Sequence, residues 1–197
     1  MDTDLSQLAT VNHHGFAFLL AYGLTWLLAA GVWRWRGQRA GAYAVLLQGV
    51  IALPIAFGLM ALTAAGPRPQ DSLLDELSTA LAVSQVFALP ILIYLILRRA
   101  HRQVPIVLAA VTIVHFSPYW WLYRTPLYMV LAGVLAIGLF VVCRLADRRA
   151  DALAGAGPDA PAALRGGAGP SATPGDWAIP AFTGAVLVIG AIIALLL

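Results

Sequence analysis

The sequence predicts an all-α protein: a polytopic transmembrane helical bundle with six spanning helices. Hydrophobic residues make up 61% of the 197 positions, and charged residues only 11%, whereas soluble domains carry about 25% charged residues. Apolar runs long enough to cross a bilayer, about twenty residues each, recur along the chain. Six such runs use most of the apolar residues, so little is left for a globular domain on either side of a membrane.

Six spanning segments are predicted. In order, they cover residues 16–33, 42–65, 72–97, 104–122, 125–143 and 177–197. The first follows Asp2 and Asp4 rather than the basic stretch that opens a secretory signal peptide, so we expect a retained helix. A cluster of arginines separates it from the second segment, which ends at the turn-forming residues Gly66 and Pro67.

Local signals place the starts of the third and fifth segments. Ser72 with Asp75 three residues on resembles a capping box. Pro118 interrupts the fourth segment, which ends in tyrosines and tryptophans typical of a membrane interface. Thr125 and Pro126 suit the N-cap and the first position of the fifth helix. Because so few residues lie between them, the fourth and fifth segments should form a tight antiparallel hairpin.

The chain is predicted to form one membrane domain with an internal linker. Residues 1–145 form a five-helix transmembrane region, residues 146–176 a disordered cytoplasmic linker, and residues 177–197 the sixth helix. From residue 144 to 176 the composition shifts to Ala, Gly, Pro, Asp and Arg without helical or strand periodicity. A segment of this composition cannot assemble a core.

The arginines predict the orientation. The first, third and fifth loops hold ten arginines and the opposite side holds two, Arg68 and Arg124. Because cytoplasmic loops retain positive charge, we expect a multi-pass protein of the inner (plasma) membrane with both termini outside. The arginines of the cytoplasmic loops explain the net charge of +3. The sequence has no basic stripe with interleaved aromatic residues, so we do not expect it to bind nucleic acid. The expected partner is the lipid bilayer, and the sequence does not determine the oligomeric state.

The sequence lacks residues that several classes of enzyme require. The chain has no lysine, which P-loop NTPases and PLP enzymes require. Glu76 is the only glutamate, no GxSxG motif occurs, and Cys143 is the only cysteine. We therefore expect no enzymatic activity, no bound metal and no cofactor. The histidines and carboxylates on the outer side have suitable ligand types for a metal ion, but their spacing is not diagnostic; they are His13, His14, Asp71, Asp75 and Glu76.

Few polar side chains lie at membrane depth. His115 is the one ionisable residue there, and it could bind a ligand or proton or stay neutral and hydrogen-bond a neighbouring helix. Gln48 and Gln85 should each find an interhelical partner. At 100° per residue, Gln85 shares a helix face with Asp75 and Ser78. Such a stripe lines either a water-filled vestibule or a helix interface.

Three stretches resemble a known family. They are Gly15-Phe16, the run from Gly23 to Trp26, and the run from His115 to Tyr123. With these stretches the chain resembles a family of small uncharacterised bacterial multi-pass membrane proteins. The resemblance covers most of the transmembrane part but not the linker. It implies a helical inner-membrane protein, and it implies no catalytic residues.

The leading functional hypothesis is transport or sensing of a small molecule through an outward-facing polar pocket. The candidate pocket residues are His115, Tyr119, Gln85, Asp75 and Ser78. The alternative is a non-catalytic structural or partner-binding membrane subunit, in which the same polar side chains pair across helix contacts. A membrane-embedded enzyme or haem protein is a third hypothesis, and its haem version requires His115 to meet a second ligand such as His14.

Overall fold

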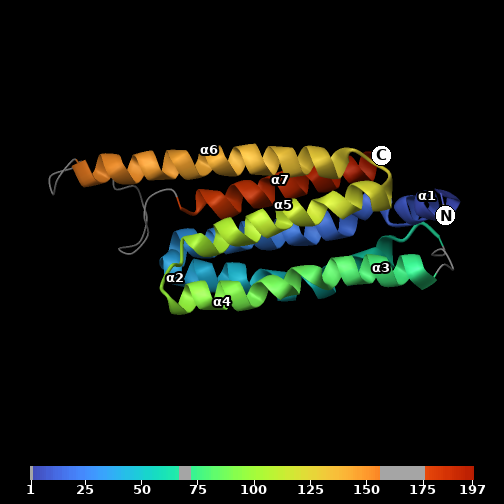
Figure 1. Cartoon of the computed structure of the whole chain (residues 1–197), viewed down its shortest axis with the longest axis horizontal. Coiled ribbons are helices and arrows are strands. Elements are labelled where there is room, and N and C mark those ends of the chain that lie inside the picture. Colours follow the sequence, from blue (N-terminus) through green and yellow to red (C-terminus); the bar gives the residue numbers. More distant parts are fainter. Residues whose placement is uncertain (1, 67–71, 156–175) are drawn as a thin grey trace.

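The computed structural model describes residues 2–66, 72–155 and 176–197. In these ranges every regular element is a helix, which confirms the predicted all-α class. The elements are α1 (Asp2–Val11), the 3-10 turn η1 (His13–Gly15), α2 (Phe16–Thr63), α3 (Ser72–Val83), the 3-10 turn η2 (Ser84–Ala88), α4 (Leu89–Leu97), α5 (Gln103–Tyr123), α6 (Leu127–Gly155) and α7 (Ala178–Leu196). The long helices run side by side along one axis (Figure 1).

Helix α2 is a hairpin of two membrane passes. It bends at Gly37, whose φ of 85° and ψ of 177° are non-helical and belong to a region open essentially to glycine alone. Contacts between the two legs show that they run antiparallel. The Thr25 hydroxyl donates a hydrogen bond of 2.8 Å to Gln48 Oε1, and the rings of Phe18 and Phe57 lie 5.3 Å apart. Gln48 thus has the interhelical partner that its burial requires.

The described residues make six passes through the bundle. Five helical stretches are long and apolar enough to cross a membrane. The first, His13–Thr63, has 51 residues and would be about 76 Å long if straight, so its fold at Gly37 supplies two passes. Large apolar side chains such as Ile137 and Phe140, 70% and 67% exposed, cover the outside of the bundle. An apolar exterior of this kind is what a bilayer solvates.

The two ends of the bundle differ in charge. Both termini lie at one end, which we call the terminal end (Figure 1). The opposite end, called the arginine end, carries the bend of α2, the α4–α5 connection and the end of α6 (Figure 1). The described arginines there are Arg34, Arg36, Arg39, Arg98, Arg99, Arg102, Arg144, Arg148 and Arg149. The predicted grouping of these loops on one side is therefore present, except that Arg165 lies outside the described residues.

The third pass is interrupted where a single helix was predicted. Helix α3 gives way to η2 before α4 starts, and Pro90 occupies the first turn of α4. Proline has no N–H for the bond to the carbonyl four residues earlier, and its ring clashes with that carbonyl. The tighter η2 turn accommodates this conflict and places Ser84 and Gln85 beside α5, which η2 contacts.

The fifth pass begins as predicted and ends later. Thr125 Oγ1 accepts a 3.3 Å hydrogen bond from the backbone N–H of Leu127, which confirms Thr125 as the capping residue. Helix α6 then continues to Gly155, although the sequence was predicted to leave the helix near Cys143 and become a linker at residue 146. Residues 144–155 are rich in Ala, Leu and Arg, which are strong helix formers, so the helix continues into the predicted linker. The rest of the predicted linker up to residue 175 lies outside the described residues.

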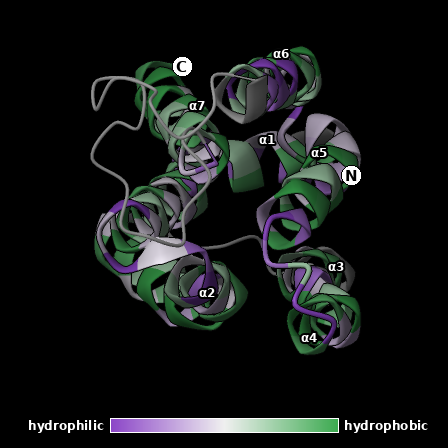
Figure 2. Ribbon diagram, turned by 90° about the vertical axis from the view of Figure 1, so that its left-hand side faces the viewer, coloured by the Kyte–Doolittle hydropathy of each residue, from purple (hydrophilic) through white to green (hydrophobic). Residues whose placement is uncertain are grey.

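The passes form a ring in which α7 lies beside α2 and α6, on the opposite side from α3 and α4 (Figure 2). Two glycines allow α7 to approach α2 closely. A Cβ added to Gly184 would lie 2.8 Å from the Gly23 carbonyl oxygen, which is closer than real Cβ contacts. Helix α1, which was not predicted from the sequence, covers the terminal end and buries Leu5 and Leu8.

Candidate functional site

A small, partly enclosed cavity lies around His115, nearer the terminal end of the bundle. It has a volume of about 40 Å³. Its walls come from η1, the first leg of α2, the α3–η2 segment, α5, α6 and α7: Gly15, Phe18, Leu19, Tyr22, Ala82, Gln85, Thr112, His115, Phe116, Tyr119, Tyr123, Tyr128 and Leu187. None of these lining residues is Asp, Glu or Arg, so the polar groups of the cavity are neutral amide, hydroxyl and imidazole groups.

His115 bonds to the η2 turn. Its Nδ1 lies 3.1 Å from the hydroxyl oxygen of Ser84. That hydroxyl also donates a 2.8 Å hydrogen bond to the Leu81 carbonyl, and a serine has a single hydroxyl hydrogen. In a neutral imidazole, Nδ1–H is therefore the donor to Ser84, and Nε2 is left as a hydrogen-bond acceptor. The interhelical pairing expected of a structural histidine is present, and one ring nitrogen stays available to a ligand.

Three tyrosines close the cavity toward the terminal end. The rings of Tyr119, Tyr123 and Tyr128 stack on one another with centroids 5.4 to 5.8 Å apart. The Tyr128 hydroxyl donates a 2.6 Å hydrogen bond to the His14 carbonyl. Gly15 beside it has a φ of 83°, and a Cβ there would lie 2.1 Å from the same hydroxyl. Only glycine leaves room for this contact, so the η1 turn and the tyrosines are fitted to each other.

A larger groove lies on the other side of His115. It is open, measures about 620 Å³ and runs between the α3–η2 segment and α5. Most of its lining is apolar, and its polar members are Ser84, Gln85, His115 and Ser117. Because Gln85 and His115 also line the small cavity, these two side chains form the wall between the cavity and the groove.

The structure brings together three of the five predicted site residues. His115, Tyr119 and Gln85 line the small cavity. Ser78 lines a smaller adjoining space that Tyr119 also borders. The side chain of Asp75 lies outside the described residues. The opening of this cavity toward the outside stays a prediction.

Sequence reasoning missed several lining residues. Thr112, Phe116 and Tyr123 recur with His115 and Tyr119 at intervals of three and four, the spacing of one helix face, so a helical projection of α5 could have found them. Tyr22 and Tyr128 come from other helices and carry no comparable local signal. In the part of the chain that the structure describes, no group of three or more His, Cys, Asp or Glu could hold a metal ion.

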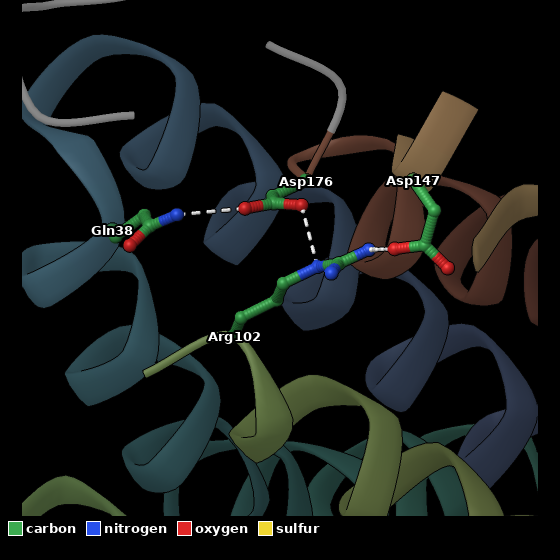
Figure 3. Close-up of polar contacts among 4 residues, drawn as sticks. All are labelled: Gln38, Arg102, Asp147 and Asp176. Atoms are coloured by element: carbon green, nitrogen blue, oxygen red, sulfur yellow. Dashed lines mark hydrogen bonds and ion pairs between the residues drawn. The ribbon is translucent and has the colours of Figure 1, made fainter. Parts of the chain in front are cut away.

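A second polar cluster lies at the arginine end, and it consists of Gln38, Arg102, Asp147 and Asp176; Figure 3 shows their contacts. Asp176, just before α7, is 1% exposed and accepts a 2.7 Å hydrogen bond from Gln38 Nε2. Its Oδ1 lies 2.9 Å from Arg102 Nε. Arg102 also donates to Asp147 of α6 at 2.5 Å. Partial burial opposes the charge on Arg102, but the carboxylates of Asp147 and Asp176 outweigh it and raise its pKa.

We call this group of four residues the Arg102 cluster. It joins the bend of α2, the start of α5, α6 and the start of α7. The adjacent Trp177 adds a further contact, because the Arg34 guanidinium lies 5.0 Å from the centroid of its ring, within the range of a cation–π interaction.

Comparison with known proteins identifies a family but no activity. Residues 5–156 match a family of unknown function, DUF7010, which confirms the predicted resemblance to an uncharacterised family. The matched stretch contains every residue that lines the cavity except Leu187 of α7. No curated protein and no solved structure matches the chain significantly. Since the match covers more than half of the sequence, the chain belongs to DUF7010, a family of unknown function.

Proposed function

We propose that this membrane protein binds a small neutral solute in the cavity around His115 and serves to transport or sense it, without catalysis. The observation that carries the proposal is the position of His115 and Gln85, which line both the small cavity and the larger open groove. Polar side chains that only join helices have no need to border two spaces. We further propose that the terminal end faces the outside of a plasma membrane, because the arginines gather at the opposite end.

The size and polarity of the cavity limit the solute. A volume of about 40 Å³ holds a few water-sized groups, whereas a cavity that binds benzene measures about 150 Å³. No lining residue carries a full charge that could pair with an ion, and a buried unpaired ion is costly. The Nε2 atom of His115 offers an acceptor. We therefore expect a solute of a few heavy atoms that is neutral and donates hydrogen bonds.

A structural subunit is the second candidate. The hydrogen bond between Thr25 and Gln48 and the contact between His115 and Ser84 are the pairings that such a subunit would use to hold helices together. In this alternative the space around His115 is a packing defect, and no molecule from outside enters it.

Access to position 115 separates the two candidates. The protein would carry the substitutions Cys143→Ala and His115→Cys, and intact cells would receive either a membrane-impermeant maleimide or the lipid-soluble N-ethylmaleimide. The proposal predicts that the cysteine reacts with at least one of them at a rate comparable to a control cysteine at the exposed position Glu76. If neither reagent reacts while the control does, position 115 is packed between helices, and this result would favour the function of a structural subunit.

A further inference from the structure

A small outer chamber lies between the cavity and the terminal end. It has a volume of about 10 Å³, close to the space of one water molecule. Its polar lining consists of Asn12, Ser78 and Thr79, with Phe57 and Met60 beside them. The chamber therefore joins the segment after α1 to the second half of α3.

An aromatic partition divides the outer chamber from the cavity. Phe18, Ala82, Tyr119 and Tyr123 line both spaces, so they form the wall between them. Within this partition the rings of Tyr119 and Tyr123 stack with centroids 5.8 Å apart. Rotation of these side chains would join the two spaces without moving a helix, because side-chain rotamers exchange much faster than helices rearrange.

Asn12 is an unusual feature of the outer chamber. It is 7% exposed, and its side-chain oxygen Oδ1 is buried with no hydrogen-bond partner among the described residues. Its backbone is held in place, because its N–H donates to the Leu8 carbonyl and its carbonyl accepts from the Gly15 N–H. A buried acceptor without a donor destabilises the folded state, because it has lost its hydrogen bond to water. A solute that donates a hydrogen bond would remove this destabilisation.

We propose that the outer chamber is the entry subsite of the cavity, where the Asn12 amide oxygen recognises a neutral hydrogen-bond donor and the partition of Phe18, Ala82, Tyr119 and Tyr123 is the gate. This inference rests on the proposed function and adds the route and a recognition residue. The solute passes from one acceptor, Asn12 Oδ1, to a second, His115 Nε2. The polar stripe that contains Ser78 and Gln85 runs along this route, because Ser78 lines the chamber and Gln85 the cavity.

The test blocks the outer chamber in one variant and the open groove in another, and it measures how fast one reagent modifies a cysteine at position 115 in each. The probe is hydroxyethyl methanethiosulfonate, a small neutral reagent with a hydroxyl donor, and it modifies the cysteine of His115→Cys in the Cys143→Ala background. Thr79→Trp fills the outer chamber, and Ala110→Trp is the matched control in the open groove. Both original side chains are exposed, so the folded state should tolerate both substitutions, and thermal unfolding in detergent would verify this.

We expect Thr79→Trp to slow the modification about tenfold or more and Ala110→Trp to leave it within about twofold. Asn12→Leu removes the acceptor at similar volume, and loss of one hydrogen bond should slow the reaction about fivefold. Tyr119→Ala should accelerate it by opening the gate. The negatively charged sulfonatoethyl reagent should react much more slowly than the neutral one.

Two results would overturn the inference. If Ala110→Trp slows the reaction and Thr79→Trp does not, the solute enters sideways from the groove, and the proposed function survives without the outer route. If Asn12→Leu has no effect while Thr79→Trp blocks, the chamber is a passage in which Asn12 recognises nothing. A cysteine at position 115 that reacts with no reagent overturns the proposed function itself, which keeps the two failures distinct.

Discussion

Asp176 illustrates what burial does to a single charged residue. A carboxylate that is 1% exposed has lost its water, and such burial is tolerated only with a counter-charge and hydrogen bonds. Arg102 supplies the first and Gln38 the second. Gln38 lies in α2 and Arg102 at the start of α5. The contacts of the buried Asp176 carboxylate therefore hold the start of α7 against both helices.

Replacement of Asp176 by asparagine should therefore lower the free energy of unfolding. The shape and the acceptor for Gln38 are kept, but the attraction to Arg102 is lost. Because Arg102 is partly exposed and retains Asp147, the cost should be about 1 to 2 kcal/mol. Unfolding in mixed detergent micelles would measure it.

The matched control is Asp147→Asn, which removes a carboxylate whose side chain is 46% exposed. Exposed ion pairs contribute about 0 to 1 kcal/mol, so this variant should stay nearer the wild type. Equal losses for the two variants would show that the burial of Asp176 has no energetic consequence.

At the scale of elements, the packing of α7 against α2 depends on the absence of two side chains. Gly23 and Gly184 bring the two backbones together, and a Cβ on Gly23 would lie 2.8 Å from Val188 Cγ2 and 2.9 Å from the Val188 backbone nitrogen. Lipid offers little hydrophobic drive for helix association, so close van der Waals packing of small residues holds such helices together. A backbone atom can give way only if the whole helix moves.

Gly23→Ala and Gly184→Ala should each destabilise the protein by about 1 to 3 kcal/mol, even though alanine favours the helical state by about 1 kcal/mol over glycine. Gly49→Ala and Gly133→Ala are the matched controls, because a Cβ at either position meets nothing within 4 Å. The controls should be neutral or stabilising in the same unfolding assay. A similar response at all four positions would contradict a close approach of α2 and α7.

At the scale of the whole molecule, the described residues make six passes, with both termini at one end and the described arginine clusters at the other (Figure 1). A reporter fused after Leu197 tests which side this is. Alkaline phosphatase, which folds to an active form outside the cytoplasm, should be active there, and green fluorescent protein should be dark when exported by the same route. A second fusion within the loop after Arg99 should give the opposite pattern. A cytoplasmic signal from the C-terminal fusion would reverse the proposed orientation.

The sequence by itself determined the fold class, the number of passes and the end at which the arginines gather. These features depend on transfer of apolar segments into lipid and on charge distribution, and both are summed over consecutive residues. Thr125 as a cap and the tight α5–α6 hairpin were also predictable, because their signals lie within a few positions. The break at η2 and the extension of α6 were not foreseen, since each depends on a local balance between proline sterics or helix propensity and the surrounding packing.

Only the tertiary structure decided which polar groups meet. Gln38 and Asp176 are hydrogen-bonded across 138 positions of sequence, and Tyr128 reaches the His14 carbonyl across 114. Of the predicted site, His115, Tyr119 and Gln85 share one cavity, while Ser78 lies beyond the aromatic partition. There it meets Asn12, a residue that was not predicted as part of the site. The physical reason is that a helix's own sequence sets which face is polar, whereas the neighbour that this face meets is set by how all the helices pack.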